Sequence, residues 1–123
     1  MASAFLVLAG HTGETLEGTL GAIRPNSLTL VVMMGLAGRA AIAARLEAHG
    51  WSPELPAAIV CAAGTPDAWT WTGRLRDAAG ATIPQGLPGV LVIGEVVGVR
   101  EALLAASVRP EAATDEVKYG RNR

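Results

Sequence analysis

Five short apolar runs, rich in β-branched residues, set the strongest limit on how this chain folds. Runs this short and this apolar are typical of strands buried inside a sheet rather than of surface strands. The third and fourth are too close together for a helical crossover, which takes about a dozen residues, so they should pair antiparallel. In chain order the runs are 4–9, 28–34, 57–62, 69–74 and 90–93.

Helical patterns alternate with these runs. Gly38–His49 carries apolar residues at helical spacing and ends in a His-Gly pair, where glycine can take the left-handed conformation that terminates a helix. Arg100–Ser107 is a second predicted helix, in which Leu103 and Leu104 should point inward. Glu14–Leu20 is either a short third helix or an irregular segment. The sequence therefore predicts an α/β fold: a single domain whose mixed parallel and antiparallel sheet of about five strands is flanked by helices.

Length and composition fit one small domain. The chain has 123 residues, of which half are hydrophobic, and a chain near this size buries roughly two-thirds of its unfolded surface. Residues 1–108 are expected to form the domain. Hydrophobicity falls and charge rises from Glu111 onward, so residues 109–123 are expected to form a poorly ordered polar tail.

Charge and apolar content exclude some partners. The formal net charge is −1, so no basic excess points to nucleic acid or to an anionic membrane surface. The apolar N-terminus is only as long as a strand and has no preceding basic segment, which argues against a signal peptide or a membrane helix. The cytoplasm is the expected location.

General catalytic motifs are nearly absent from the sequence. It contains no phosphate-binding loop, no nucleophile elbow and no metal-spaced set of histidines and cysteines, so no catalytic residue and no metal ligand is assigned. The single cysteine, Cys61, cannot form an internal disulfide and lies inside the third apolar run. We interpret Cys61 as a small buried hydrophobe rather than a nucleophile.

Two strand ends suggest a surface for a ligand. The second run ends in Met33–Gly35, two soft side chains followed by a glycine that would let a ligand approach the backbone. The third run leads into Ala62–Thr65, where small side chains would leave backbone groups accessible to a group such as adenine. A plain core role for the two methionines is the alternative.

Three further residues are candidates for contacts outside the core. His11 follows a strand that ends in Gly10, at the edge where α/β sheets present ligand-facing groups, so it is a candidate substrate-facing residue, with a structural role as the alternative. Trp69 and Trp71 alternate with threonines in the fourth run. We expect one of them to face outward, as tryptophan often does at interfaces. That favours a second hypothesis, a non-catalytic ligand-binding or dimerisation module.

Four motifs follow one another in a distinctive order. They are Thr29–Leu36 (TLVVMMGL), Leu46–Trp51 (LEAHGW), Gly64–Gly73 (GTPDAWTWTG) and Gly94–Val97 (GEVV). In this order they resemble the C-terminal domain of uroporphyrinogen-III C-methyltransferases, in the tetrapyrrole methylase superfamily. The first strand, which ends in Gly-His, resembles the start of that domain. The resemblance covers residues 3–106.

The resemblance implies an enzyme that uses S-adenosyl-L-methionine and releases S-adenosyl-L-homocysteine. Its substrate would be uroporphyrinogen III, methylated at two pyrrole carbons to precorrin-2 on the way to siroheme or cobalamin. Met34 of the MGL motif and Ala63 at the start of the GT-P loop would contact the cofactor. Met33 stands where the family often has tyrosine, and Ala63 where it often has glycine. The neighbours expected to help bind the cofactor are Met33, Gly35, Gly64 and Thr65.

The family's N-terminal domain carries a Gly-Pro-Gly-Asp loop and the acid/base candidates, and this sequence contains no such loop. We therefore expect the chain alone to transfer methyl groups weakly or not at all. Its expected partners are an N-terminal methylase domain, a tetrapyrrole substrate and further copies of itself in a homo-oligomer. The chain would then be an excised fragment, a proteolytic remnant or half of a split protein. A related methylase that acts on another precorrin is the alternative.

Overall fold

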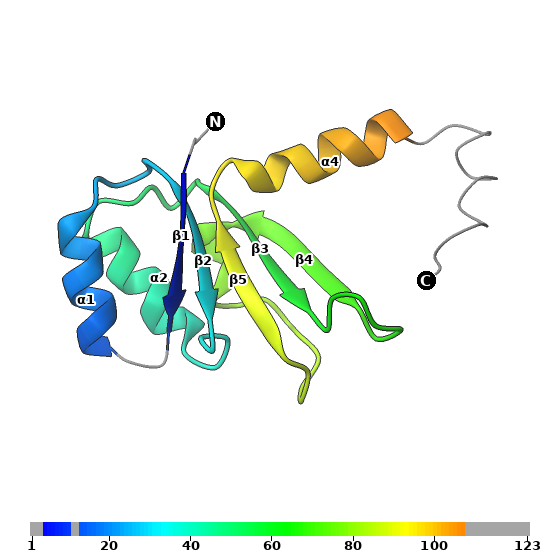
Figure 1. Ribbon diagram of the computed structural model, residues 1–123, viewed down its shortest axis with the longest axis horizontal. Helices are drawn as coiled ribbons and strands as arrows, with labels where there is room; N and C mark the ends of the chain where they lie inside the picture. Colours follow the sequence, from blue (N-terminus) through cyan, green and yellow to red (C-terminus); the bar gives the residue numbers. More distant parts are fainter. Residues whose placement is uncertain (1–3, 11–12, 108–123) are drawn as a thin grey trace.

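The computed structural model describes residues 4–10 and 13–107, which form one mixed sheet with helices (Figure 1). The sheet has the order β1-β2-β5-β3-β4; β1 and β2 are parallel, and every other neighbouring pair is antiparallel. The predicted fold class is confirmed, and so is the antiparallel pairing of β3 with β4. The strands are β1 (Phe5–Ala9), β2 (Thr29–Met33), β3 (Pro56–Cys61), β4 (Trp69–Arg74) and β5 (Gly89–Ile93).

The expected division of the chain stays a prediction. The proposed tail of residues 109–123 lies outside the described residues, and so does the end of the proposed domain at residue 108. His11, the candidate substrate-facing residue, also lies outside them.

The described residues contain four helices: α1 (Gly13–Ala22), α2 (Arg39–Ala48), α3 (Leu75–Ala78) and α4 (Val96–Ser107). The segment that was predicted to be either helical or irregular is the helix α1. As predicted, α2 ends at a His-Gly pair, and Gly50 takes a φ of 94° there. The short helix α3 was not predicted, because a single helical turn leaves no periodic pattern in the sequence.

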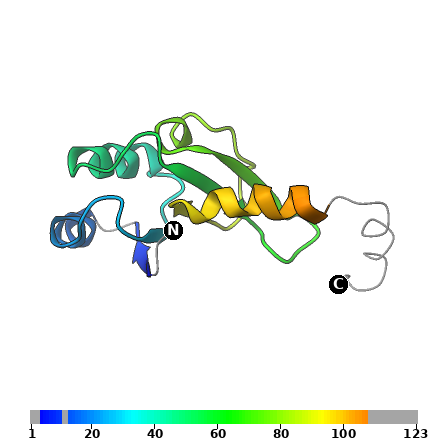
Figure 2. The same ribbon diagram turned by 90° about the horizontal axis from the view of Figure 1, so that it is seen from above.

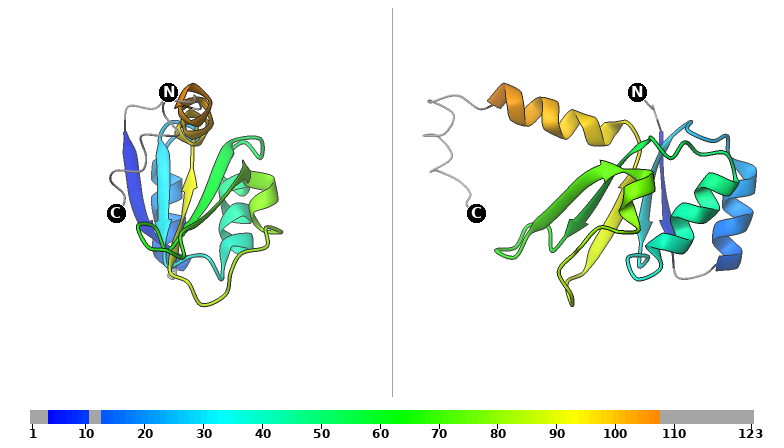
Figure 3. Two further views of the ribbon diagram at one scale, coloured as in Figure 1. Left: turned by 90° about the vertical axis from the view of Figure 1, so that its right-hand side faces the viewer. Right: turned by 180° about the vertical axis from the view of Figure 1, so that it is seen from behind.

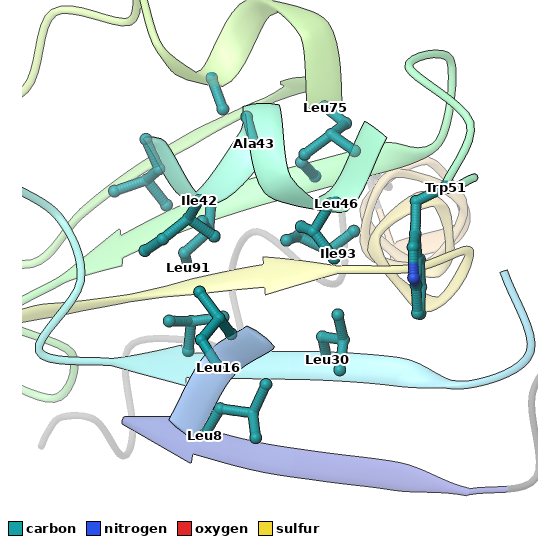
Figure 4. Close-up of a cluster of buried hydrophobic side chains, with 14 of the residues drawn as sticks. Leu8, Leu16, Leu30, Ile42, Ala43, Leu46, Trp51, Leu75, Leu91 and Ile93 are labelled. Atoms are coloured by element: carbon teal, nitrogen blue, oxygen red, sulfur yellow. The ribbon is translucent and has the colours of Figure 1, made fainter. Parts of the chain in front are cut away.

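Helices α1, α2 and α3 lie on one face of the sheet, and Figure 3 shows this in the view from behind. Alternate side chains of each strand point to that face, so Leu30 and Val32 of β2 are fully buried. Figure 4 shows how the strand residues meet Leu16 of α1 and Leu46 of α2. Cys61 is completely buried in this core, which confirms its interpretation as a small hydrophobe.

The prediction that one of Trp69 and Trp71 faces outward is wrong. Residues two apart in a strand point to the same face of a sheet, and only the threonines between them point to the other. Both indole rings pack against the core on the helix-covered face, where they stand opposite Cys61 and Ile59 of β3. Neither tryptophan therefore offers an interface residue on the opposite face.

The opposite face of the sheet exposes apolar side chains. Phe5 is 71% exposed and Val7 is 50% exposed on β1, and Met33 at the end of β2 is 44% exposed. Among the described residues, no helix covers this face over β1 and β2, as Figure 1 shows. Phe5 and Val7 therefore form an apolar surface, called the open sheet face below.

Helix α4 differs from its prediction in its start and in its orientation. It begins at Val96, because Gly94 with a φ of 152° turns the chain out of β5 and its carbonyl accepts a hydrogen bond from the Val97 N–H. Leu103 and Leu104 were expected to point inward, but they are 63% and 48% exposed. Figure 2 shows the reason, since this end of α4 extends beyond the sheet.

Two glycines let β1 and β2 end close together. The Gly10 N–H donates to the Met33 carbonyl at 2.7 Å. A Cβ atom added at Gly10 would lie 2.9 Å from the Gly35 Cα and 2.8 Å from a methyl carbon of Val32. Both neighbours belong to the edge where the strands end, so this contact fixes the start of the loop that follows β2.

We expect Gly10→Ala to lower the free energy of unfolding by about 1–3 kcal/mol, because backbone atoms of Gly35 cannot move aside cheaply. The matched control is Gly18→Ala in α1, where an added Cβ would meet nothing within 4 Å. That control should raise the free energy of unfolding by about 0.5–1 kcal/mol. Urea denaturation measures both, and a Gly10→Ala variant at least as stable as the wild type would contradict the importance of the close Gly10–Gly35 approach.

Candidate functional site

Strands β2 and β3 run in the same direction on either side of β5, so their C-terminal ends lie at one edge of the sheet. The loops that begin at Met34 and Ala62 therefore flank the start of β5 at Gly89. Figure 1 shows this edge at the bottom of the sheet, opposite α4. In α/β proteins, ligands bind beyond the carboxyl ends of strands where the chain connections diverge.

An open cleft with a volume of about 650 Å³ lies at this edge. That volume is within the roughly 300–1,000 Å³ that is usual for small-molecule sites. The lining is mostly apolar, and among the described residues that line it, Asp67 carries the only charge. The lining residues are Met33, Met34, Val60, Ala62, Ala63, Thr65, Asp67, Leu87, Pro88, Gly89 and Val90.

Both sides of the cleft hold a non-glycine residue in the left-handed backbone region. Met34 has a φ of 57° and Ala62 a φ of 50°; in the described part of the chain, Asn26 is the other such non-glycine residue. This conformation costs about 1–2 kcal/mol for an L-residue, and such strain gathers at ligand sites. It presents the Met34 side chain, 62% exposed, at the cleft. The alternative that the two methionines are plain core residues is therefore wrong.

Hydrogen bonds shape the loop after β3. The Ala62 N–H donates to the Pro88 carbonyl at 2.8 Å, which ties this loop to the segment before β5. The Thr65 hydroxyl donates to the Ala62 carbonyl at 2.7 Å and accepts from the Asp67 N–H at 3.2 Å. Within the described residues, the backbone groups of Ala63 and Gly64 have no hydrogen-bond partner. They remain available to a ligand, as the small side chains predicted.

Sequence comparison finds siroheme synthases and structural comparison finds uroporphyrin-III C-methyl transferases, although no family model matches the chain. Siroheme synthase of Neisseria meningitidis serogroup C (strain 053442) is 44% identical over 75 residues, which are 61% of this chain and 16% of that relative. A uroporphyrin III C-methyl transferase from Thermus thermophilus superposes with a TM-score of 0.66 at 30% identity. The superposition covers 80% of this chain and 43% of that one. A second structure, complexed with S-adenyl homocysteine, has a TM-score of 0.65 at 30% identity over 80% of this chain and 44% of that one.

In sequence and fold the chain is similar to the C-terminal domain of tetrapyrrole methylases, as the ordered motifs predicted. The chain spans less than half of the Thermus protein and about a sixth of the siroheme synthase.

The structure brings four of the predicted cofactor residues together. Met33, Met34, Ala63 and Thr65 all line the cleft, whereas Gly35 and Gly64 do not. Close packing explains the first glycine, since a Cβ atom at Gly35 would lie 2.8 Å from the Ile42 Cδ1 atom. A φ of 80° explains Gly64. Neither glycine needs a ligand to account for it.

Sequence reasoning missed the third part of the cleft. Leu87, Pro88, Gly89 and Val90 line it between the two loops, but in the sequence the residues before β5 are an ordinary Pro- and Gly-rich turn. Their role depends on the position of β5 between β2 and β3. The only sequence feature that could have indicated this role is the position of the turn directly before a buried strand.

The ion pairs Glu17–His49, Glu17–Arg45, Glu54–Arg74 and Glu54–Arg76 lie away from the cleft. Glu17 of α1 contacts His49 at 2.9 Å and Arg45 at 3.1 Å. The hydrogen bond with His49 lowers the pKa of Glu17, and the charges of His49 and Arg45 lower it further. Glu54 pairs with Arg74 and with Arg76 near the opposite end of β3.

The described residues also show neither a metal-binding cluster nor a helix that could span a membrane. It holds no cluster of three or more His, Cys, Asp or Glu side chains that could bind a metal ion. Within residues 4–10 and 13–107, every helix is too short or too polar to cross a membrane. The cleft itself offers apolar walls, free backbone groups and the Asp67 carboxylate.

Proposed function

We propose that the cleft binds S-adenosyl-L-methionine, and that the chain is the C-terminal, cofactor-binding part of a uroporphyrinogen-III C-methyltransferase. The observation that carries the proposal is the cleft itself, in which the MGL loop and the GT-P loop flank the start of β5. The Thermus relative crystallised with S-adenyl homocysteine supports it, because that structure shares the fold at 30% identity.

The residues of the cleft fit this cofactor. The exposed side chains of Met33 and Met34 can pack against an adenine ring, since thioether sulfur makes favourable contacts with aromatic groups. The unpaired backbone groups of Ala63, which lines the cleft, supply a donor and an acceptor for a base or ribose. Asp67 places one negative charge beside a ligand that carries a sulfonium and an ammonium group.

We expect the chain to bind S-adenosyl-L-homocysteine in calorimetric titration, and Ala63→Phe to weaken that binding about tenfold or more, because the ring would fill the cleft. Ala68→Phe is the matched control, since Ala68 is exposed in the same loop but does not line the cleft. Urea midpoints should be unchanged in both variants. A wild-type chain that binds no cofactor analogue would contradict the proposal, and equal affinities of the two variants would remove Ala63 from the site.

We propose further that methyl transfer needs residues beyond this chain. Catalysis requires several groups held around the reacting centre, and Asp67 is the only ionisable group among the described residues of the cleft. The purified chain with S-adenosyl-L-methionine and uroporphyrinogen III should therefore form no measurable precorrin-2 by absorbance. Adding the separately expressed N-terminal domain of a relative should produce it. Efficient formation by the chain alone would show that it holds a complete active site.

The substrate is the part of the proposal that rests most on the relatives. A cobalt precorrin-4 methyltransferase superposes with a TM-score of 0.65 at 14% identity, which shows the shared fold alone. Uroporphyrinogen III is proposed over another precorrin because the relatives at 44% and 30% identity are a siroheme synthase and a uroporphyrin III methyl transferase. The cytoplasmic location stays a prediction.

We also propose a homo-oligomer, but the tryptophans do not support it, since both pack against the core. The open sheet face exposes Phe5 and Val7, and α4 exposes Leu103 and Leu104. Exposed apolar surface of this kind is typical of protein interfaces. We propose that a second copy of the chain covers it.

We expect light scattering to show a dimer whose population falls with dilution. Phe5→Lys should shift the equilibrium towards monomer, because a charge would be buried in the interface. Ala44→Lys, at an exposed position of α2, is the control and should leave it unchanged. A monomer at every concentration would rule out this use of the open sheet face.

A further inference from the structure

Arg39, the first residue of α2, directs its guanidinium group to three backbone carbonyls. Its Nε donates to the Ala78 carbonyl at 2.9 Å, its Nη1 to the Leu36 carbonyl at 2.8 Å and its Nη2 to the Ala81 carbonyl at 2.7 Å. The side chain is half-buried, and its partners among the described residues include no carboxylate. Arginine suits this role because its planar fork can bond several acceptors at once.

The three carbonyls belong to two segments that lead to the cleft, although none of the three residues lines it. Leu36 lies in the loop that carries Met34. Ala78 and Ala81 lie at the end of α3 and just beyond it, where the chain sets out towards Leu87 and the start of β5. The segments joined are far apart in sequence, by 39 and 42 residues. Arg39 thus connects the loop that carries Met34 to the segment that leads to Leu87 and the start of β5.

A second cavity lies beside Arg39 and shares one lining residue with the cleft. Arg39, Leu36 and Leu87 line this cavity of about 420 Å³, and Leu87 also lines the cleft. Leu36 in addition packs on Gly89, where an added Cβ would lie 2.8 Å from the Leu36 Cδ1 atom. A shift of Leu36 would therefore reach Gly89 directly.

We propose that Arg39 is a positioning residue, which fixes the Met33–Leu36 loop against the segment of residues 79–90 and so keeps the cleft preformed. Its effect on cofactor binding rests on the function proposed above, whereas its effect on the two segments does not. A site that is ordered before the ligand arrives loses less conformational entropy on binding. Arg39 contacts no cleft-facing atom itself, so it acts through the segments it holds.

Hydrogen–deuterium exchange of the full chain tests the proposal together with titration of S-adenosyl-L-homocysteine. Arg39→Met should speed exchange about tenfold in peptides covering 33–38 and 79–90, because bonds from a charged donor are lost there. Peptides covering 57–61 should keep their rates. Arg39→Lys, which keeps the charge but not the fork, should give an intermediate rate. Affinity for S-adenosyl-L-homocysteine should fall about tenfold in Arg39→Met.

Arg45→Met is the matched control, because Arg45 lies on the same helix but bonds the Gly13 carbonyl and Glu17 at α1. It should leave exchange in the two segments and the affinity unchanged. Faster exchange throughout the chain would overturn the proposal, because Arg39 would then stabilise the whole fold. Unchanged exchange in the two segments would also overturn it, because Arg39 would then not hold them. Faster local exchange with unchanged affinity would also overturn it.

A wild-type chain that binds no S-adenosyl-L-homocysteine would instead contradict the proposed function. In that case the exchange rates of the Arg39 variants would still decide whether Arg39 fixes the two segments. The two failures are therefore distinguishable in one set of samples.

Discussion

The hydrogen bonding of β5 to both β2 and β3 is the constraint on which the rest of this structure depends. Because β5 is antiparallel to both neighbours, β2 and β3 must run parallel to each other and end at the same edge. The loops after Met33 and Cys61 are then held a single strand apart, about 10 Å across two strand spacings. A cleft at that edge follows, with the start of β5 between its walls.

Packing on the helix-covered face makes this edge rigid enough to hold strained loops. Leu30, Val32, Leu91 and Ile93 are buried beneath the helices, so the last residues of β2 and the first of β5 have little freedom to shift. Met34 and Ala62 follow directly in left-handed conformations that an unconstrained chain would avoid. The core and the hydrogen bonds around these loops fix their shape. The loops in this shape expose a methionine side chain and free backbone groups to a ligand.

Much of the fold could be predicted because local patterns and tertiary packing agree. The run 28–34 is apolar and β-branched, and β2 occupies the inside of the sheet with Leu30 and Val32 fully buried. The predictions from sequence failed where one local pattern is compatible with more than one structure. Val96–Val99 is β-branched yet helical, and the apolar Leu103 and Leu104 remain exposed, since nothing local reports that α4 extends beyond the sheet. The outward tryptophan was an error of strand geometry, since Trp69 and Trp71 share one face.

The sequence by itself determined the strands, the main helices, the family resemblance and two of the three segments that line the cleft, because periodicity and ordered motifs are local properties of the chain. Only the tertiary structure decided the strand order, the contribution of Leu87–Val90, and the packing that requires glycine at position 35. It also revealed that Arg39 joins carbonyls from segments far apart in the chain. These contacts join residues that are far apart in the sequence. They therefore depend on the tertiary fold and cannot be predicted from a local sequence pattern.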